Sequence, residues 1–291
     1  MLTELSNEIA EIVRTVAPSV VQVRGGHRPA TGLAYSADVV VTTARVVGDS
    51  DHLRICRADG TVVAAEAAGV DPATRIAVLH ASGLDGRALV PAVLPQVGNI
   101  GIAVARSWSN VITASAGLVS IIGGPLATGR RRSIEQVIRT SAPMHEGFAG
   151  GAFLGADGAL LGVATAASIR GLGVVIPASI AWAAAGELLN RGAQKRGYLG
   201  IAVQPVRVPE RQRDAAGADQ ALLITAVKDS TPAADGGLLV GDVLTSLDGH
   251  ALTSPDDLLD LLVGERVGRT VALRVTRGGV PVDVPVTIRE R

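Results

Sequence analysis

The chain has 291 residues, of which 47% are hydrophobic and 2% aromatic, and its formal net charge at pH 7 is zero. This length allows two domains with a sizeable core, and the balanced charge argues against an obligate binder of nucleic acid or anionic membranes. The single cysteine, Cys56, excludes an internal disulfide framework and a cysteine-based metal site. We expect no cofactor and no metal, and we interpret Cys56 as a small buried apolar residue.

Residues 1–16 are predicted to form an amphipathic helix, because apolar residues recur at helical spacing between Glu4, Glu8 and Glu11. No secretory signal is visible, so the chain as written is expected to be cytoplasmic; loss of an N-terminal anchor or signal would instead make it extracytoplasmic. Residues 107–129 carry no charge, but glycines and Pro125 interrupt them. Two strands and a turn are therefore predicted there, and no membrane span.

Short apolar runs recur about every ten residues as far as residue 176, a rhythm that predicts a β-barrel or β-sandwich. Asp59-Gly60 is expected to turn a hairpin, and residues 70–75 a turn before a buried strand. Residues 180–191 favour a helix that ends at Gly192. The earliest expected strands lie at residues 18–23, 33–35, 39–41, 53–56, 62–63 and 76–79.

The strand pattern restarts at Gly197. Ser254 followed by Pro255 and Asp257 is a strong helix start, with a serine N-cap, a proline in the first turn and an acid at the third position. Strands are predicted at residues 198–203 and 221–227, and a closing hairpin from residues 271–275 and 280–288. The second half is therefore expected to be a smaller α+β domain.

Six short motifs resemble, in the same order, those of the HtrA/DegP serine proteases. They are residues 17–21 (APSVV), 41–47 (VTTARVV), 71–79 (DPATRIAVL), 116–120 (AGLVS), 173–177 (GVVIP) and 197–201 (GYLGI). The resemblance implies an all-β-dominated fold in which a trypsin-like double β-barrel precedes one C-terminal PDZ domain. The expected domains are an N-terminal helix at 1–16, a degenerate protease domain at 17–192 and a PDZ domain at 193–291.

The catalytic positions of the resemblance carry no catalytic side chains. The family's histidine falls on Arg45, its aspartate on Arg75 and its serine on Ala149. A triad needs a base that titrates near neutral pH, a carboxylate to orient it, and a nucleophile. Arginine stays protonated and an alanine methyl has no removable proton. The sequence therefore predicts a pseudoprotease with no catalytic residues.

Two alternatives at this site remain open. A relocated triad would have to use groups away from the family's positions: His52, His145, Thr42, Thr43 and Ser141. A remnant of the oxyanion loop is expected at the amides of Gly147 and Ala149. Arg45 and Arg75 would lie near that loop, where they either form an anion- or carboxylate-binding pocket or pair locally, for example with Asp71, Asp49 or Glu146.

The PDZ half is expected to bind peptides or protein C-termini, because a PDZ domain adds an extended peptide to a sheet edge. The resemblance implies that the amides of Tyr198, Leu199, Gly200 and Ile201 hold the terminal carboxylate. Leu258, Leu259 or Leu262 would line the socket for the last side chain; the alternative is that these leucines belong to the core only.

The sequence thus favours a non-catalytic HtrA-like protein that binds peptides or C-termini as a scaffold, regulator or chaperone-like factor in protein quality control. One alternative is an active HtrA-type serine endopeptidase. Another is a regulatory subunit that assembles with active paralogues or with itself. Family trimers pack aromatic residues of the N-terminal segment, but the first aromatic residue here is Tyr35.

Overall fold

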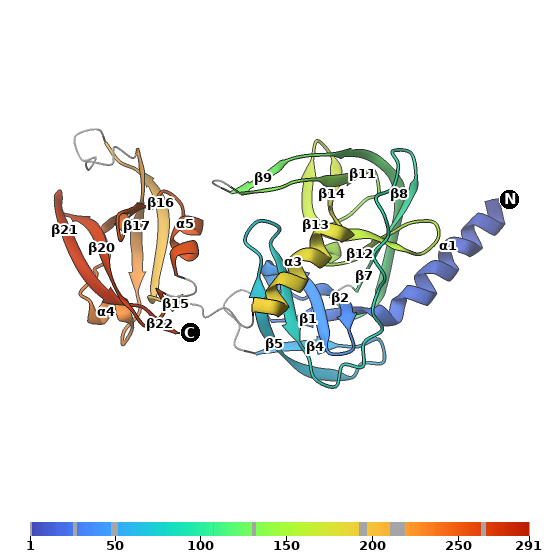
Figure 1. Cartoon of the computed structure of the whole chain (residues 1–291), viewed down its shortest axis with the longest axis horizontal. Helices are drawn as coiled ribbons and strands as arrows, with labels where there is room; N and C mark the ends of the chain where they lie inside the picture. Colours follow the sequence, from blue (N-terminus) through green and yellow to red (C-terminus); the bar gives the residue numbers. More distant parts are fainter. Residues whose placement is uncertain are drawn as a thin grey trace. The chain divides into compact units, whose positions relative to one another are not determined.

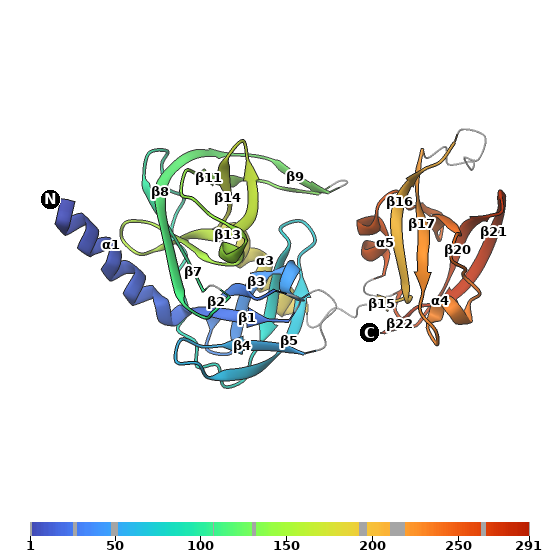
Figure 2. The same cartoon turned by 180° about the vertical axis from the view of Figure 1, so that it is seen from behind.

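The computed structural model describes residues 2–25, 28–47, 52–106, 108–129, 132–191, 197–209, 219–262 and 266–290. The chain divides into two compact units, and the boundary falls between residues 193 and 194. Figure 1 shows that both units consist mainly of β-strands, and Figure 2 shows them from behind. The mostly-β fold class predicted from the sequence is confirmed.

The first unit starts with a helix, followed by a closed six-stranded antiparallel barrel in the order β1-β2-β3-β6-β5-β4. The helix, α1, extends away from the barrels (Figures 1 and 2). The predicted helix and the hairpin across Asp59-Gly60 are both confirmed. The elements are α1 (Leu2–Val16), η1 (Ala17–Ser19), β1 (Val20–Arg24), β2 (Ala30–Ser36), β3 (Val39–Thr43), α2 (Ala44–Val47), β4 (Leu53–Cys56), β5 (Val62–Val70) and β6 (Ile76–His80).

A second closed barrel follows, in the order β11-β14-β13-β12-β7-β8, with a separate hairpin formed by β9 and β10. Helix α3 packs against strands of both barrels. The elements are β7 (Ile100–Arg106), β8 (Ile112–Gly123), β9 (Leu126–Gly129), β10 (Arg132–Ile134), β11 (Val137–Thr140), η2 (Glu146–Phe148), β12 (Ala152–Leu154), β13 (Leu160–Ile169), β14 (Leu172–Pro177) and α3 (Ala178–Arg191). Gly192, the expected end of α3, lies outside the described residues.

The uncharged segment 107–129 contains strands β8 and β9, as predicted. Among the described residues, no helix has the length and apolar character that a bilayer crossing requires. Glycine at position 101 is required by packing, because a Cβ there would lie 2.0 Å from Cζ of Phe153. Phe153 is fully buried inside the second barrel, so this contact helps to fill a core with few aromatic residues.

One apolar cluster contains buried residues of both barrels, in addition to the cluster inside each barrel. In β7, Ile102 and Val104 belong to the cluster between the barrels, whereas Ala103 and Ala105 face the interior of the second barrel. The buried Arg106 ends this strand and donates from its guanidinium to the carbonyls of Val20, Asn110 and Ala17. These bonds satisfy a buried cation and tie the end of α1 to both barrels.

The second unit contains a mixed-length antiparallel sheet in the order β16-β17-β18-β20-β21, with β19 beside β18 and a small β15–β22 pair. Its elements are β15 (Gly197–Tyr198), β16 (Ile201–Arg207), β17 (Gln220–Val227), α4 (Pro232–Asp235), β18 (Val243–Leu247), β19 (His250–Ala251), α5 (Pro255–Leu261), β20 (Thr270–Arg277), β21 (Val280–Thr287) and β22 (Arg289–Glu290). The predicted closing hairpin is β20–β21 and is confirmed.

Two local predictions in this unit have different outcomes. The helix start at Ser254 is confirmed, because Ser254 and Asp257 form a reciprocal capping box at the beginning of α5. The single strand predicted at 198–203 is wrong, since β15 and β16 are separated at Leu199 and Gly200. Gly200 has φ +85°, and a Cβ there would lie 2.4 Å from Cβ of Thr231, so this position breaks the strand and requires glycine.

The second unit contains an ion pair between the buried carboxylate of Asp242 and the partly exposed Arg277. Arg277 donates from Nε and Nη2 to the two carboxylate oxygens at 2.8 and 2.7 Å, and these bonds lower the pKa of Asp242. We expect Asp242→Asn to destabilise this unit by about 1.5–3 kcal/mol at pH 7. The measurement is amide hydrogen exchange in β18 and β20, which reports the stability of this unit alone.

The pH dependence follows from the direction of the pKa shift. Because the folded-state pKa of Asp242 is lowered, its contribution to the stability of this unit is complete above the ordinary aspartate pKa of about 3.9. The contribution is lost as the pH falls through the lowered pKa. The matched control is Asp283→Asn, which removes the exposed Arg274–Asp283 pair. That change should have the smaller effect on stability, because water screens an exposed pair. Equal effects of the two substitutions on stability would contradict the conclusion that the Asp242–Arg277 pair stabilises this unit.

Candidate functional site

The loop that precedes β12 holds Ala149 against the first barrel. Ala149 is only 3% exposed, and its carbonyl accepts a hydrogen bond from the amide of Thr31 in β2 at 3.0 Å. The next residue, Gly150, has φ +83°, and a Cβ there would lie 2.0 Å from the Thr31 carbonyl oxygen. Glycine is therefore required beside Ala149 to bring the loop this close to β2.

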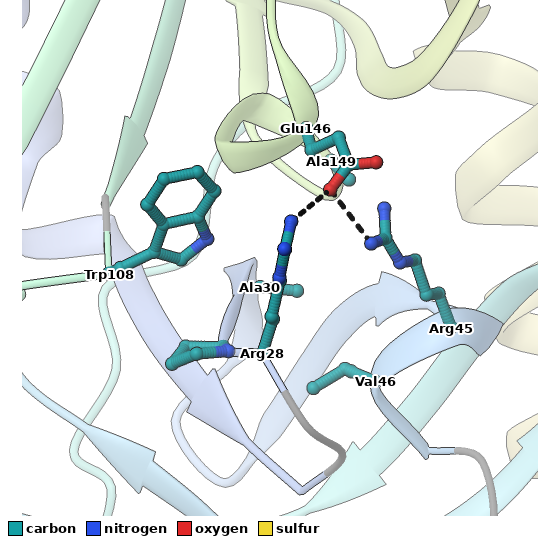
Figure 3. A pocket seen from close by; sticks show the side chains of 8 residues that line it. Arg28, Ala30, Arg45, Val46, Trp108, Glu146 and Ala149 are labelled. Carbon is teal, nitrogen blue, oxygen red and sulfur yellow. Dashed lines mark hydrogen bonds and ion pairs between the residues drawn. The ribbon is translucent and has the colours of Figure 1, made fainter.

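Three charged side chains from both barrels meet next to Ala149 (Figure 3). Arg45 of α2 donates from Nη2 to Oε2 of Glu146 at 2.9 Å, and Arg28 donates from Nη1 to the same oxygen at 3.0 Å. The hydrogen bond from Arg45 and its charge, followed by those of Arg28, lower the pKa of Glu146. All three side chains are at least half exposed, so water screens these pairs.

These charges border a small open hollow. Its volume is about 250 Å³, open solvent included, and Arg45 and Ala149 are both among its lining residues. Trp108 forms another part of the wall and is 50% exposed. The guanidinium carbon of Arg28 lies 5.9 Å from the centroid of the Trp108 ring, a cation–π distance. Two permanent cations and one carboxylate leave this cluster with an excess positive charge.

Arg75 does not line the hollow. It is exposed immediately before β6 with φ 60°, and its carbonyl accepts a hydrogen bond from the amide of Ala44 at 2.7 Å. Its backbone therefore lies beside the segment that carries Arg45. Asp71 is engaged locally, since its carboxylate accepts from the amide and hydroxyl of Thr74. Of the three acids expected as local partners of the arginines, Glu146 forms an ion pair with Arg45. Asp49 lies outside the described residues.

The two amides expected in an oxyanion remnant are engaged within the loop. Gly147 donates its amide to Nδ1 of His145 at 3.0 Å, and Ala149 donates to the carbonyl of Glu146 at 3.2 Å. The side chain of His145 also stacks edge-on against Phe148, with ring centroids 5.1 Å apart. In this conformation the amides of Gly147 and Ala149 have separate acceptors and do not converge on one ligand oxygen.

The side chains considered for a relocated triad lie in different surroundings. Thr42 is fully buried and donates to the Thr31 carbonyl at 2.7 Å, and Ser141 accepts from the amide of Leu118 at 2.9 Å. The hydroxyl oxygen of Thr43 is buried without a hydrogen-bond partner among the described residues. His52 is exposed just before β4.

A second candidate site lies at the start of β16. Leu199 and Gly200 are both buried, and their carbonyls accept hydrogen bonds from Ala233 and Lys228. Within the described part of the chain, the amides of Leu199 and Gly200 donate to no carbonyl or side-chain acceptor. Two neighbouring amides without acceptors in a buried loop form a site for an anionic group such as a carboxylate.

The residues around this loop fall into two groups. Leu258 and Leu262 are buried in the core of the second unit at 4% and 5% exposure, whereas Leu259 between them is 57% exposed. Tyr198 and Ile201 are half-buried, and Tyr198 pairs with Arg289 in the β15–β22 ribbon. Helix α5 packs against β16. Leu259 is therefore the leucine of the three that retains apolar surface for a ligand.

Arg28 and Trp108 at the first site were not predicted from the sequence. Arg28 precedes β2 and Trp108 lies between β7 and β8, so both come from loops without a distinctive motif. Trp108 is one of only two tryptophans in the chain, and this rarity was the one available signal. The described residues contain no group of three His, Cys, Asp or Glu side chains that could hold a metal ion.

Comparison with known families agrees with this architecture. Residues 30–163 match the trypsin-like peptidase domain, and residues 197–288 match the PDZ domain. Among solved structures, the serine endoprotease from Yersinia pestis is 26% identical with a TM-score of 0.54, and the comparison covers 97% of this chain and 98% of that one. The HtrA-type protease AlgW with a decapeptide has a TM-score of 0.56, at 23% identity and coverage of 97% and 98%. The chain is therefore a trypsin-like peptidase fold joined to a PDZ domain.

The curated relatives of this chain include DegP-like and DegS serine endoproteases. A probable periplasmic DegP-like serine endoprotease of Brucella suis is 29% identical over 279 residues, which are 91% of this chain and 54% of the relative. The serine endoprotease DegS of Escherichia coli is 26% identical over 264 residues, 86% of this chain and 73% of DegS. These relatives agree with the resemblance to HtrA/DegP proteases that the sequence motifs predicted. This chain spans about half the length of the DegP-like relatives it matches.

Proposed function

We propose that this chain is a non-catalytic HtrA-like protein that binds peptides or protein C-termini through its PDZ domain, as a scaffold, regulator or chaperone-like factor. The observation that carries the non-catalytic part is that Arg45 and Ala149 line one hollow. By resemblance these are the positions of the base and the nucleophile. A guanidinium cannot take a proton near neutral pH, and a methyl group cannot attack a carbonyl.

Peptide binding is supported by three features of the second unit. Among the described residues, the amides of Leu199 and Gly200 have no acceptor and one edge of β16 has no partner strand, and Leu259 is exposed on the adjacent helix. Together they offer a carboxylate site, a backbone ladder and an apolar wall, which are the components of strand addition by a PDZ domain. A structural neighbour, the HtrA-type protease AlgW, was solved with a decapeptide, which favours peptide binding by this chain by analogy.

A second candidate, an active serine endopeptidase, is favoured by the names of the relatives. Both the Brucella and the Escherichia coli proteins are named serine endoproteases. The side chains at positions 45, 75 and 149 weigh against this function, because no base, orienting carboxylate or nucleophile is present there. The name of the Brucella relative also describes it as periplasmic, which favours the extracytoplasmic alternative for the location of this chain.

The binding proposal is tested with the full chain and a panel of fluorescent octapeptides that end in different apolar residues, each with a free or an amidated C-terminus. We expect amidation to weaken binding about 10- to 100-fold, because it removes charge-assisted hydrogen bonds to the loop amides. Fluorescence anisotropy gives the dissociation constants. Equal affinity of both forms would contradict recognition of the carboxylate, and no binding by any peptide would contradict the proposed function.

A further inference from the structure

Strand β16 is an edge strand with one open side. In the sheet order it has β17 on one side and no strand on the other among the described residues. A peptide that adds to this sheet must therefore pair with β16 through the backbone groups that point to the open side. Which residues supply those groups follows from the register between β16 and β17.

Two hydrogen bonds at the ends of the pair fix that register. Val208 donates its amide to the carbonyl of Asp219, next to the Arg207–Gln220 pair, and Lys228 donates to the carbonyl of Gly200, next to the Ile201–Val227 pair. In an antiparallel ladder such flanking bonds mark a pair whose own backbone groups point away from each other. Arg207 and Ile201 therefore direct their amide and carbonyl groups to the open side.

The backbone groups of the residues between them point alternately to β17 and to the open side. Gln204 and Val206 form the pairs that bond to β17, whereas Val203 and Pro205 face the open side. A proline has no N–H group, and within sheets it is tolerated where the missing donor faces away from the partner strand. The open edge thus presents complete backbone pairs at Ile201 and Val203, followed by Pro205, which offers a carbonyl alone.

We propose that Pro205 limits this PDZ domain to the last four residues of its ligands. The inference rests on the proposed function. A ligand strand runs antiparallel to β16 with its carboxylate at the amides of Leu199 and Gly200. With the two-residue period of a strand, its last residue lies beside Ile201, its third-last beside Val203 and its fifth-last beside Pro205. The carbonyl of the fifth-last residue finds no donor.

The ligand class follows from this geometry. It is the free C-terminus of an extended chain with an apolar last residue, read over four residues. The next complete backbone pair on the open edge is at Arg207, the last residue of β16, and lies beyond the missing bond, so ligand residues further upstream add little affinity. The side chain of Pro205 is exposed. Its replacement therefore changes the edge without removing core packing, and the missing N–H can be restored without a cavity.

The test compares two lengths of one ligand on the full chain. The probe is the tightest carboxylate octapeptide of the panel described above, with alanine or serine in its first four positions, and the tetrapeptide of its last four residues. We expect the two to bind the natural chain within about twofold of each other. Pro205→Ala should tighten the octapeptide about two- to tenfold, the size of one restored hydrogen bond, and leave the tetrapeptide unchanged.

Gln204→Ala is the matched control, because Gln204 is an exposed neighbour whose backbone bonds to β17. It should reproduce the natural chain with both peptides. The proposal is overturned if the natural chain binds the octapeptide more than tenfold tighter than the tetrapeptide, or if Pro205→Ala leaves the octapeptide unchanged. If neither peptide binds the natural chain, the proposed function itself fails, which is a distinct result.

Discussion

The purified 291-residue chain incubated with β-casein should leave the substrate intact. Loss of a complete triad lowers kcat by about 10⁶-fold in a serine protease, so turnover should be indistinguishable from background. A fluorophosphonate probe should form no covalent adduct, because Ala149 has no hydroxyl to react. An active HtrA-type protease assayed in parallel shows that substrate and probe are competent. A covalent adduct of the natural chain would overturn the non-catalytic proposal.

Restoration of the nucleophile sharpens this prediction. Ala149→Ser alone should stay unlabelled, because Arg45 cannot act as the base. The triple variant Arg45→His, Arg75→Asp, Ala149→Ser should still be at least about 10²-fold slower than an active relative, since the amides of Gly147 and Ala149 are already engaged within the loop. Full activity of the triple variant would contradict the loop conformation described above.

Adjacent leucines of α5 should separate binding from stability. Leu259→Asp should weaken binding of carboxylate peptides at least about tenfold, because it replaces the exposed apolar wall with a charge that repels the ligand carboxylate. Its effect on stability should be small, since the side chain is exposed. Leu258→Ala should cost about 2–5 kcal/mol of stability, because Leu258 is buried in the core. Anisotropy and hydrogen exchange measure the two effects.

The matched control for Leu259 is Val280→Asp. Val280 is 61% exposed at the start of β21, the strand at the opposite edge of the sheet from β16. This substitution adds the same charge to an equally exposed apolar position and should leave peptide affinity unchanged. If both substitutions weaken binding alike, the loss reflects the added charge and not a groove beside Leu259.

Local chemistry made several elements predictable from the sequence. Ser254 and Asp257 form their capping box within four residues, and the hairpin across Asp59-Gly60 depends on neighbouring residues only. The split between β15 and β16 was missed because the run from Tyr198 to Val203 has the composition of a continuous strand. The close approach of Thr231 to Gly200, which breaks it, comes from a distant segment.

Site residues were predictable where a motif marked them and not where long-range packing created them. The family resemblance placed Arg45 and Ala149, and both line the hollow. The ion pairs of Arg28 and Arg45 with Glu146 join segments more than 100 residues apart and are set by the packing of the two barrels. Leu258 and Leu259 have the same chemistry, and only the orientation of α5 against the sheet distinguishes the core residue from the exposed one.

The open edge of β16 also bears on solubility. An unpaired strand is a template for other extended chains, including copies of itself, and long flat edges promote aggregation. A domain that binds ligands at such an edge cannot cover it, so the risk of aggregation remains. Pro205 interrupts the row of donors in the middle of the strand, so intermolecular sheets cannot propagate along its full length. The missing amide hydrogen thus weakens strand pairing at the part of the edge beyond the four-residue ligand site, which itself remains accessible.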